Sequence, residues 1–390
     1  MRLSDFKSVS LPAALGAALL VSMAAAPANA TQFVVNNLVS DGSVPAVTID
    51  PDLVNPWGIA SSPTGPFWLS DNHTGLSTLY NTGGTKLGLT VAVAPPLGGA
   101  PPAAPTGIVF NGSSSFKVTG AKGSGAAAFI YDTEDGTISG WSAGIDLTHS
   151  LLAVDNSGSG AVYKGLAIGT DVGPSIYATN FNSGQVEEYD GSFNLVRTFT
   201  DGGVDPGYAP FNVQTIGGHL FVTFALQDAL KHDDVGGAGN GYVDEFNMDG
   251  SFVKRLVSLG GQINSPWGLA LAPTAFGTFA GDLLVGNFGD GTISAFDIAT
   301  GAFKGKLDGT DGNPLVLGDL WALANGNGGM GGSADKVYFT AGIQDEAQGL
   351  FGSITGVPEP GTWAMSALGV GLIGAVLRRR RTPAAAGQAA

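Results

Sequence analysis

The chain of 390 residues contains no cysteine, so no disulfide can stabilise it and no thiolate can serve as a nucleophile. Its body, from about Thr31 to Gly356, also lacks long runs of the helix formers Ala, Leu, Glu and Lys, whereas the chain has 62 glycines and 21 prolines. This composition disfavours a helical bundle and favours many short strands joined by turns. The fold must rely on its core and its backbone hydrogen bonds.

Positive charge is scarce in the body. Six of the 17 basic residues and two of the 32 acidic residues lie in the two ends, which leaves 11 basic against 30 acidic side chains and a net charge of −19. Such a surface repels nucleic acid and anionic lipid, so we expect no nucleic-acid partner. It favours divalent cations or neutral partners, or else it simply keeps an exported protein soluble.

The usual signals of nucleophilic and zinc catalysis are missing too. No G-x-S-x-G elbow occurs between a strand and a helix. The four histidines are His73, His149, His219 and His232, and no two have the i, i+3 or i+4 spacing of a zinc pair. His73 could act as a base if its turn faces a central channel, or it is a solvated turn residue; His219 is interpreted as structural.

The N-terminus has the pattern of a cleaved signal peptide. Arg2 and Lys7 precede an apolar stretch from Leu11 to Ala26, and Ala28 and Ala30 place small residues at the two specificity positions of a signal-peptidase site. We expect residues 1–30 to form a signal helix that signal peptidase removes, so that the mature chain begins near Thr31.

The C-terminus contains three elements in order. Pro358, Glu359 and Pro360 form a triplet that cannot be absorbed into a following helix. An apolar run from Trp363 to Leu377 suits a lipid-embedded helix with Trp363 at one interface. Four cytoplasmic arginines then follow at the other end: Arg378, Arg379, Arg380 and Arg381.

This order resembles the PEP-CTERM sorting signal of Gram-negative bacteria that make exopolysaccharide. The resemblance implies that an exosortase reads the triplet and that the inner membrane holds the chain only transiently. A permanent anchor is the alternative, but a helix of these 15 residues would rise ~23 Å, short of the ~30 Å hydrocarbon core. We assign residues 357–381 to the sorting signal with its transmembrane segment and expect residues 382–390 to be a disordered tail.

The body contains six similar openings whose third residues are spaced by 49, 58, 47, 56 and 54 positions. A period near 50 with strand-like contents predicts a propeller, with an open β-solenoid as the alternative. The openings are Pro56-Trp57-Gly58, Pro105-Thr106-Gly107, Tyr163-Lys164-Gly165, Pro210-Phe211-Asn212, Pro266-Trp267-Gly268 and Leu320-Trp321-Ala322.

Each unit reads as a four-stranded meander. Asp135-Gly136 and Asp290-Gly291 indicate two-residue hairpins of type I′ between second and third strands. The sixth unit ends after a third strand at Leu350 to Thr355, and Phe33 to Val39 has no unit of its own. We therefore predict an all-β, six-bladed propeller over residues 31–356, in which this N-terminal strand completes the last blade and removes an open edge.

The repeat is similar to NHL-type six-bladed propellers. The whole body, with its NPWG and SPWG openings and its GNGYVDEF stretch, resembles an uncharacterised family of exported bacterial propellers. The resemblance implies the architecture only, because unrelated functions occur on this fold.

Two sets of oxygen-bearing residues are candidate metal ligands. The second strands end in Asp71, Asp132, Asn180 and Asn287, which resembles the channel-mouth ligands of calcium-dependent propeller lactonases and esterases. The alternative is that these residues satisfy backbone groups in tight turns. Asp228, Asp233 and Asp234 lie in a long hairpin loop of the fourth unit and form the second set. Trp57, Trp267 and Trp321 are expected to pack between blades.

The function predicted from these patterns is that of an exported propeller of the cell surface or extracellular matrix. It would bind exopolysaccharide or a surface protein through loops on one face, without catalysis. The alternative is a calcium-dependent hydrolase that works in the channel.

Overall fold

The computed structural model describes residues 31–357. The predicted signal helix, the C-terminal transmembrane helix and the tail lie outside the described residues. Within residues 31–357, no helix has the length and apolar character needed to cross a membrane.

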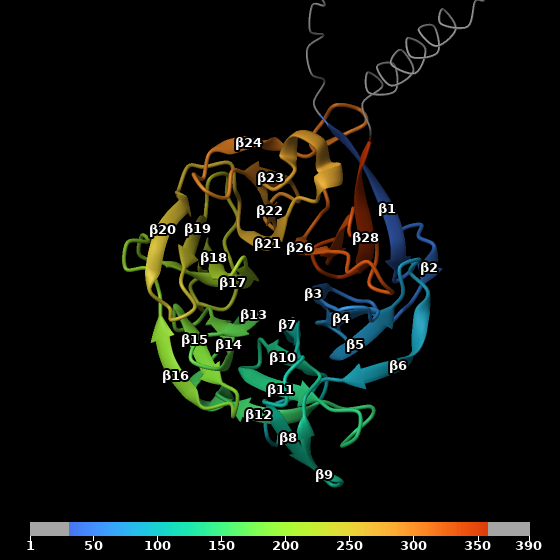
Figure 1. Cartoon of the computed structure of the whole chain (residues 1–390), viewed down its shortest axis with the longest axis vertical. Coiled ribbons are helices and arrows are strands. Elements are labelled where there is room, and N and C mark those ends of the chain that lie inside the picture. The colour runs from blue at the N-terminus through green and yellow to red at the C-terminus, as the bar shows by residue number, and fades with distance from the viewer. Residues whose placement is uncertain (1–30, 358–390) are drawn as a thin grey trace, which may run out of the picture. The chain divides into compact units, whose positions relative to one another are not determined.

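The described chain forms six four-stranded blades arranged in a ring (Figure 1), which confirms the predicted all-β propeller. In blades 1 to 5 the strands follow one another from the channel outward. Blade 1 contains β3 (Pro56–Ala60), β4 (Phe67–Asp71), β5 (Leu76–Tyr80) and β6 (Lys86–Ala92); blade 2 contains β7 (Pro105–Phe110), β10 (Phe129–Thr133), β11 (Thr137–Trp141) and β12 (Leu151–Asp155). Blade 3 contains β13 (Tyr163–Thr170), β14 (Pro174–Asn180), β15 (Gln185–Asp190) and β16 (Leu195–Phe199); blade 4 contains β17 (Tyr208–Ile216), β18 (His219–Leu226), β19 (Tyr242–Phe246) and β20 (Phe252–Val257); blade 5 contains β21 (Pro266–Leu271), β22 (Leu283–Asn287), β23 (Ile293–Phe296) and β24 (Phe303–Lys306).

Blade 6 combines both ends of the described chain. Its inner strands are β26 (Leu320–Asn325), β27 (Val337–Ala341) and β28 (Leu350–Val357), and β1 (Gln32–Ser40) supplies the fourth strand. β1 runs antiparallel to β28, from the pair Gln32 and Val357 to the pair Ser40 and Leu350. The short strands β2 (Thr48–Ile49) and β25 (Asp308–Gly309) add to β1. The predicted closure by the N-terminal strand is confirmed.

Outside the blades there are few regular elements. A hairpin of β8 (Lys117–Gly120) and β9 (Gly123–Ala126) is inserted in blade 2, and the 3-10 helices η1 (Ser157–Ser159) and η2 (Thr274–Phe279) lie in connecting loops. Aromatic side chains fill the spaces between neighbouring blades. Trp68 of blade 1 stacks on Phe129 of blade 2 at 4.0 Å between ring centroids, and Phe33 of β1 lies 4.9 Å from Phe276 of η2.

The Asp-Gly hairpins form as predicted, but the predicted type I′ turn is wrong. A type I′ turn needs positive φ at both central residues. Gly136 has φ of 80° and Gly291 has φ of 70°, whereas Asp135 and Asp290 are not among the residues with positive φ. In blade 2 a single left-handed glycine therefore ends a three-residue loop. A Cβ on Gly136 would lie 2.6 Å from the Ala161 carbonyl oxygen, so the close approach also favours glycine.

The direction of the strands defines two faces of the ring. We call the face where the first strand of each blade begins the distal face; it also carries the loops between second and third strands, such as residues 227–241. The opposite face, where the first strands end, is the terminal face. β1 begins and β28 ends toward it, because Ile354 of β28 pairs with Val337 and Val337 pairs with Asn325 at the end of β26.

Candidate site at the distal mouth of the channel

The second residue of each of the six repeated openings is buried near the ring centre. Three of these residues, Trp57, Trp267 and Trp321, contact one another: Trp57 stacks on Trp321 with ring centroids 3.4 Å apart, and Trp267 meets both rings edge-on at 6.0 and 5.8 Å. Trp321 of blade 6 packs against both neighbouring blades, as expected, and the contact between Trp57 of blade 1 and Trp267 of blade 5 also crosses the channel, so that the three rings plug it. The equivalent residues of the other blades are Thr106, Lys164 and Phe211.

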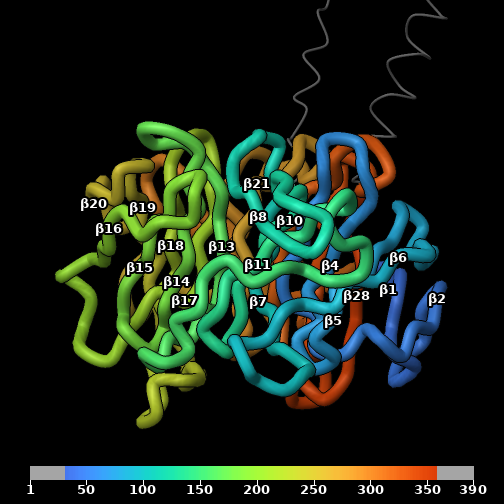
Figure 2. The backbone as a smooth tube through the Cα atoms, turned by 90° about the horizontal axis from the view of Figure 1, so that it is seen from below, coloured from blue at the N-terminus to red at the C-terminus, as the bar shows by residue number. Residues whose placement is uncertain are grey.

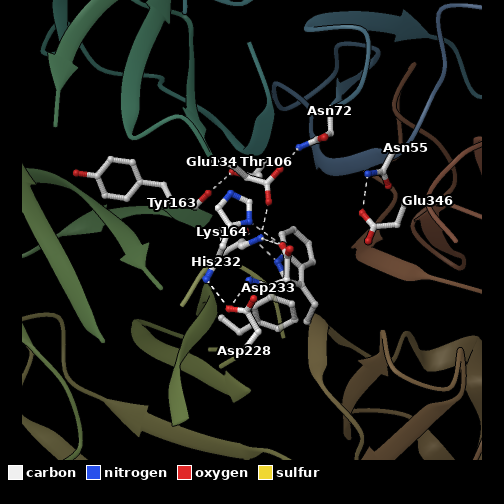
Figure 3. A network of polar contacts seen from close by, with 12 residues as sticks. Asn55, Asn72, Thr106, Glu134, Tyr163, Lys164, Asp228, His232, Asp233 and Glu346 are labelled. Carbon is white, nitrogen blue, oxygen red and sulfur yellow. Dashed lines mark hydrogen bonds and ion pairs between the residues drawn. The ribbon is translucent and has the colours of Figure 1, made fainter. Parts of the chain in front are cut away.

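Lys164 is the charged member of this inner ring. Its side chain is only 2% exposed, and its Nζ lies 5.2 Å from the centroid of the Trp57 ring. Nζ donates to Glu134 Oε1 and to Asp233 Oδ1, the latter at 3.2 Å (Figure 3). Burial alone would lower the pKa of Lys164, but the charges of Glu134 and Asp233 raise it above its usual value, so the ammonium stays protonated.

Five blades contribute side chains to this cluster. Glu134 comes from the turn between β10 and β11, and Asp233 comes from the loop between β18 and β19. Asn72, from the turn after β4, donates to Glu134 Oε2 at 2.8 Å. The Trp267 indole donates to the Lys164 carbonyl oxygen at 2.9 Å, which fixes the backbone beneath the ammonium. No two of these five residues belong to the same blade.

A second hydrogen-bonded group lies beside the first. Asn55 accepts from the Trp321 indole at 2.9 Å and donates to Glu346 Oε2 at 2.7 Å, and its amide nitrogen is 3.3 Å from His73 Nε2. Asn55 has φ of 48°, a left-handed conformation that asparagine tolerates better than most residues. Burial raises the pKa of Glu346 to about 7. His73 is exposed and joins this group, although the sequence left its role open.

The four residues predicted at the ends of second strands are engaged inside their own blades. Thr78 donates to Asp71 at 2.7 Å, the Gly107 amide donates to Asp132 at 2.6 Å, Asn180 donates to Glu187 at 2.7 Å and Asn287 donates to Thr292 at 3.0 Å. All four predicted side chains are buried, and burial raises the pKa of Asp132 to about 7. These hydrogen bonds are those expected of side chains that satisfy polar groups in neighbouring strands and turns, which is the alternative to metal binding given in the sequence analysis.

The predicted loop of blade 4 does reach the channel mouth. Asp228 Oδ1 accepts from the His232 amide at 2.9 Å and shapes the loop, while burial raises the pKa of Asp234. Of the three predicted loop residues, Asp233 is the one that pairs with Lys164. Within residues 31–357, one group of three could hold a metal: Glu134, His232 and Asp233 offer ligand atoms within 4.8 Å of one another.

The sequence prediction therefore missed Glu134, Lys164, Asn55 and Glu346. A signal for Lys164 was present, because four of the other five openings have an aromatic residue at the same position and the fifth has threonine. A charged side chain at a position that otherwise points into a core marks a residue that must find partners from elsewhere.

On the terminal side of the plug, the channel opens into a recess of about 610 Å³. The first strands of all six blades line it, mostly with aliphatic side chains, including Ile59, Ile108, Leu166, Val109, Leu269 and Leu323. The plug thus separates a polar mouth on the distal face from a largely apolar recess on the terminal face.

Comparison with known protein families identifies the C-terminal signal. The family described as PEP-CTERM protein-sorting motif matches residues 356–381, which confirms the predicted sorting signal. This motif implies that the protein is exported and processed by an exosortase.

Comparison with curated proteins identifies the family of the body. The chain is 33% identical over 333 residues to "Uncharacterized protein R648" of Acanthamoeba polyphaga mimivirus, covering 83% of this chain and 80% of the viral protein. It is 33% identical over 329 residues to "Uncharacterized protein L690" of the same virus, covering 82% and 85%. The chain belongs to the family of these uncharacterized proteins.

The chain is also similar to solved propeller structures. A streptogramin B lyase shares 10% identity with a TM-score of 0.47, over 84% of this chain and 98% of the lyase. The PQQ-bound aldose sugar dehydrogenase of Streptomyces coelicolor shares 14% identity with a TM-score of 0.47, over 85% of this chain and all of the enzyme. Likeness at this level carries no inference about activity.

Proposed function

We infer that this protein is a surface-sorted propeller whose distal channel mouth binds a neutral, hydroxyl-rich ligand such as an exopolysaccharide. In this proposal signal peptidase removes residues 1–30, the inner membrane holds residues 363–377 transiently, and an exosortase releases the body, residues 31–356, to the surface of a Gram-negative cell. The sorting motif carries the first part of the proposal. The cluster around Lys164 carries the second.

The chemistry of the cluster favours a neutral ligand over a metal-dependent reaction. The Lys164 ammonium already lies between Glu134 and Asp233, where a bound cation would have to lie. His232, Asp233 and Glu346 lie in loops of the distal face, and carboxylates and imidazoles can accept hydrogen bonds from sugar hydroxyls. The strongly acidic body disfavours an anionic ligand.

A calcium-dependent hydrolase is the second candidate. The three converging groups of Glu134, His232 and Asp233 favour it, because they could hold a cation if the ammonium moved away. The two candidates differ in one measurable respect. A hydrolase of this class requires the metal for both binding and turnover, whereas the binding protein proposed here does not.

Binding can be tested with immobilised neutral and acidic exopolysaccharides, with calcium and with a chelator. We expect retention on the neutral polymer that is unchanged by the chelator and lost in Lys164→Met. Arg255→Met is the matched control, because Arg255 is also a cation between two carboxylates, on the outer part of blade 4. Chelator-sensitive retention together with hydrolysis of an ester or lactone would favour the second candidate instead.

Sorting can be tested by replacing Pro358 and Pro360 with alanine, which lets a helix extend through the triplet. We expect uncleaved protein to accumulate in the inner membrane. Pro383→Ala, in the same tail but outside the triplet, should be processed normally. Mass spectrometry of the surface form decides the issue, because peptides from residues 363–377 in fully exported protein would contradict processing.

A further inference from the structure

Both ends of the described chain lie toward the terminal face. In blade 6, Asn325, Val337 and Ile354 mark the terminal end of the three inner strands, and Asn325 lines the recess. β28 continues past Ile354 to Val357, where it pairs with Gln32 of β1. In Figure 2 the yellow loop between β18 and β19 projects at the bottom of the view, from the distal face of the ring.

The connection from the last described residue to the apolar run is short. Only residues 358–362 separate Val357 from Trp363. A fully extended chain of this length reaches about 20 Å. The end of β28, and with it the terminal edge of blade 6, therefore stays within about 20 Å of the membrane while the run is held there.

We propose that, before processing, the propeller stands on the bilayer with its terminal face toward the lipid headgroups and its distal channel mouth pointing away. This orientation rests on the proposed function in one respect, namely that residues 363–377 are held in the membrane. The occupant of the terminal face is thus a lipid surface, held there by the short connection and not by charge, since the acidic body repels anionic lipid. The Lys164 cluster is open to ligand in the tethered precursor as well as in the released protein.

The orientation can be measured because the chain has no native cysteine, so a single introduced cysteine is labelled uniquely. Val172, 97% exposed, and Met330, 46% exposed, lie in loops between first and second strands on the terminal face. Leu230, 80% exposed, lies in the loop between β18 and β19 on the distal face. The variants Val172→Cys, Met330→Cys and Leu230→Cys, in the expected mature precursor of residues 31–390, are labelled with a donor dye and reconstituted in vesicles that contain an acceptor-labelled lipid.

We expect strong energy transfer to the acceptor lipid from positions 172 and 330, and weaker transfer from position 230 than from either of them. Insertion of about 20 Gly and Ser residues after Gly361, a flexible coil of ~25 Å, should make the three positions alike. Equal transfer from all three positions with the natural linker would overturn the orientation. Strong transfer from position 330 alone would show that the ring stands on its rim, and would overturn it as well.

Flotation of the vesicles separates this inference from the function on which it rests. A chain that does not float with the vesicles has no membrane-held run, so the proposed function fails and the orientation with it. A chain that floats but shows equal transfer retains the membrane-held run and loses only the orientation.

Discussion

Two clusters in this molecule each hold a cation between two carboxylates and beside an aromatic ring, but their residues come together in different ways. At the channel, Lys164 lies between Glu134 and Asp233 against the Trp57 ring. In blade 4, Arg255 lies between Asp201 and Asp244, with its guanidinium carbon 4.4 Å from the centroid of the Tyr242 ring. Asp244 and Arg255 are direct register partners on β19 and β20. The channel cluster instead draws its charged residues from blades 2, 3 and 4.

The difference separates a structural ion pair from a candidate functional one. The Arg255 cluster follows from strand register, since opposite charges facing each other across two strands stabilise the pairing. Nothing in the local structure of blades 2, 3 or 4 requires Glu134, Lys164 and Asp233 to meet. Placing a buried cation in an aromatic plug is costly unless it is paired, and the pairing of Lys164 with residues of two other blades at the channel mouth supports the binding role proposed above.

The largest expected effect on stability comes from removing β1, which joins the two ends of the described chain by pairing with β28. Deletion of residues 32–38 takes away the fourth strand of blade 6, together with the buried side chains Phe33 and Leu38. We expect the free energy of unfolding to fall by about 3–6 kcal/mol, since each such side chain contributes ~1.5–3 kcal/mol on burial. Urea denaturation measures this effect.

Two point variants control for the deletion. Phe33→Ala should cost about 3 kcal/mol because it leaves a cavity against η2, whereas Val34→Ala should cost little because Val34 is 39% exposed. A deletion variant with the stability of the full chain would show that β1 does not close the ring.

The next effect tests the two clusters directly. Arg255→Met leaves the buried carboxylate of Asp244 without its partner and should lower stability by about 3 kcal/mol. Lys164→Met leaves the partly buried carboxylate of Glu134 without its partner and should cost about 1–3 kcal/mol. Only Lys164→Met should free the loop of residues 227–241, because Asp233 loses its contact with the channel. Hydrogen exchange should therefore speed up in that loop for Lys164→Met and stay unchanged there for Arg255→Met. The same exchange pattern in both variants would remove the distinction between the clusters.

A smaller effect on stability is expected from a change in pH. Its direction differs between two carboxylates of the channel mouth, Glu346 and Asp233. Burial raises the pKa of Glu346 to about 7 from an ordinary 4.5, so the folded protein holds a proton that the unfolded chain releases between these values. The contribution of Glu346 to stability therefore falls as pH rises from about 4.5 to 7 and does not recover above it. Asp233 is opposite, because burial would raise its pKa but the Lys164 ammonium lowers it.

Glu346→Gln keeps an acceptor for Asn55 and removes the titration. Relative to the unaltered protein, this variant should be more stable at pH 8, by an amount on the order of 1 kcal/mol, and about equally stable at pH 4. Thermal unfolding at the two values measures the difference. A variant that is destabilised equally at both would show that Glu346 is ionised in the folded protein throughout this range.

The fold could be predicted from the sequence because its determinants are local and repeated. Openings such as Pro56-Trp57-Gly58, the Asp-Gly hairpins and the unmatched strand at Phe33 each follow from residue type and spacing, and all appear in the structure. The site could not be predicted in the same way. The partners of Lys164 are 30 residues before it and 69 residues after it, and no pattern within one blade specifies that the three converge.

The smallest expected effect concerns Asp233, which is compared with Asp201 of the other cluster. The Asp233 side chain is 66% exposed, so Asp233→Asn should change stability by less than about 1 kcal/mol. The Asp201 side chain is 13% exposed, and Asp201→Asn should cost about 1–3 kcal/mol because a buried charge-assisted bond to Arg255 is weakened. Ligand retention should show the reverse order, with a loss for Asp233→Asn and none for Asp201→Asn. This reversal would show that the Lys164 cluster keeps one weakly held carboxylate at the mouth of the channel for a ligand to contact. If Asp233→Asn proves as costly to stability as Asp201→Asn and leaves retention intact, the Lys164 cluster is a structural ion pair like that of Arg255.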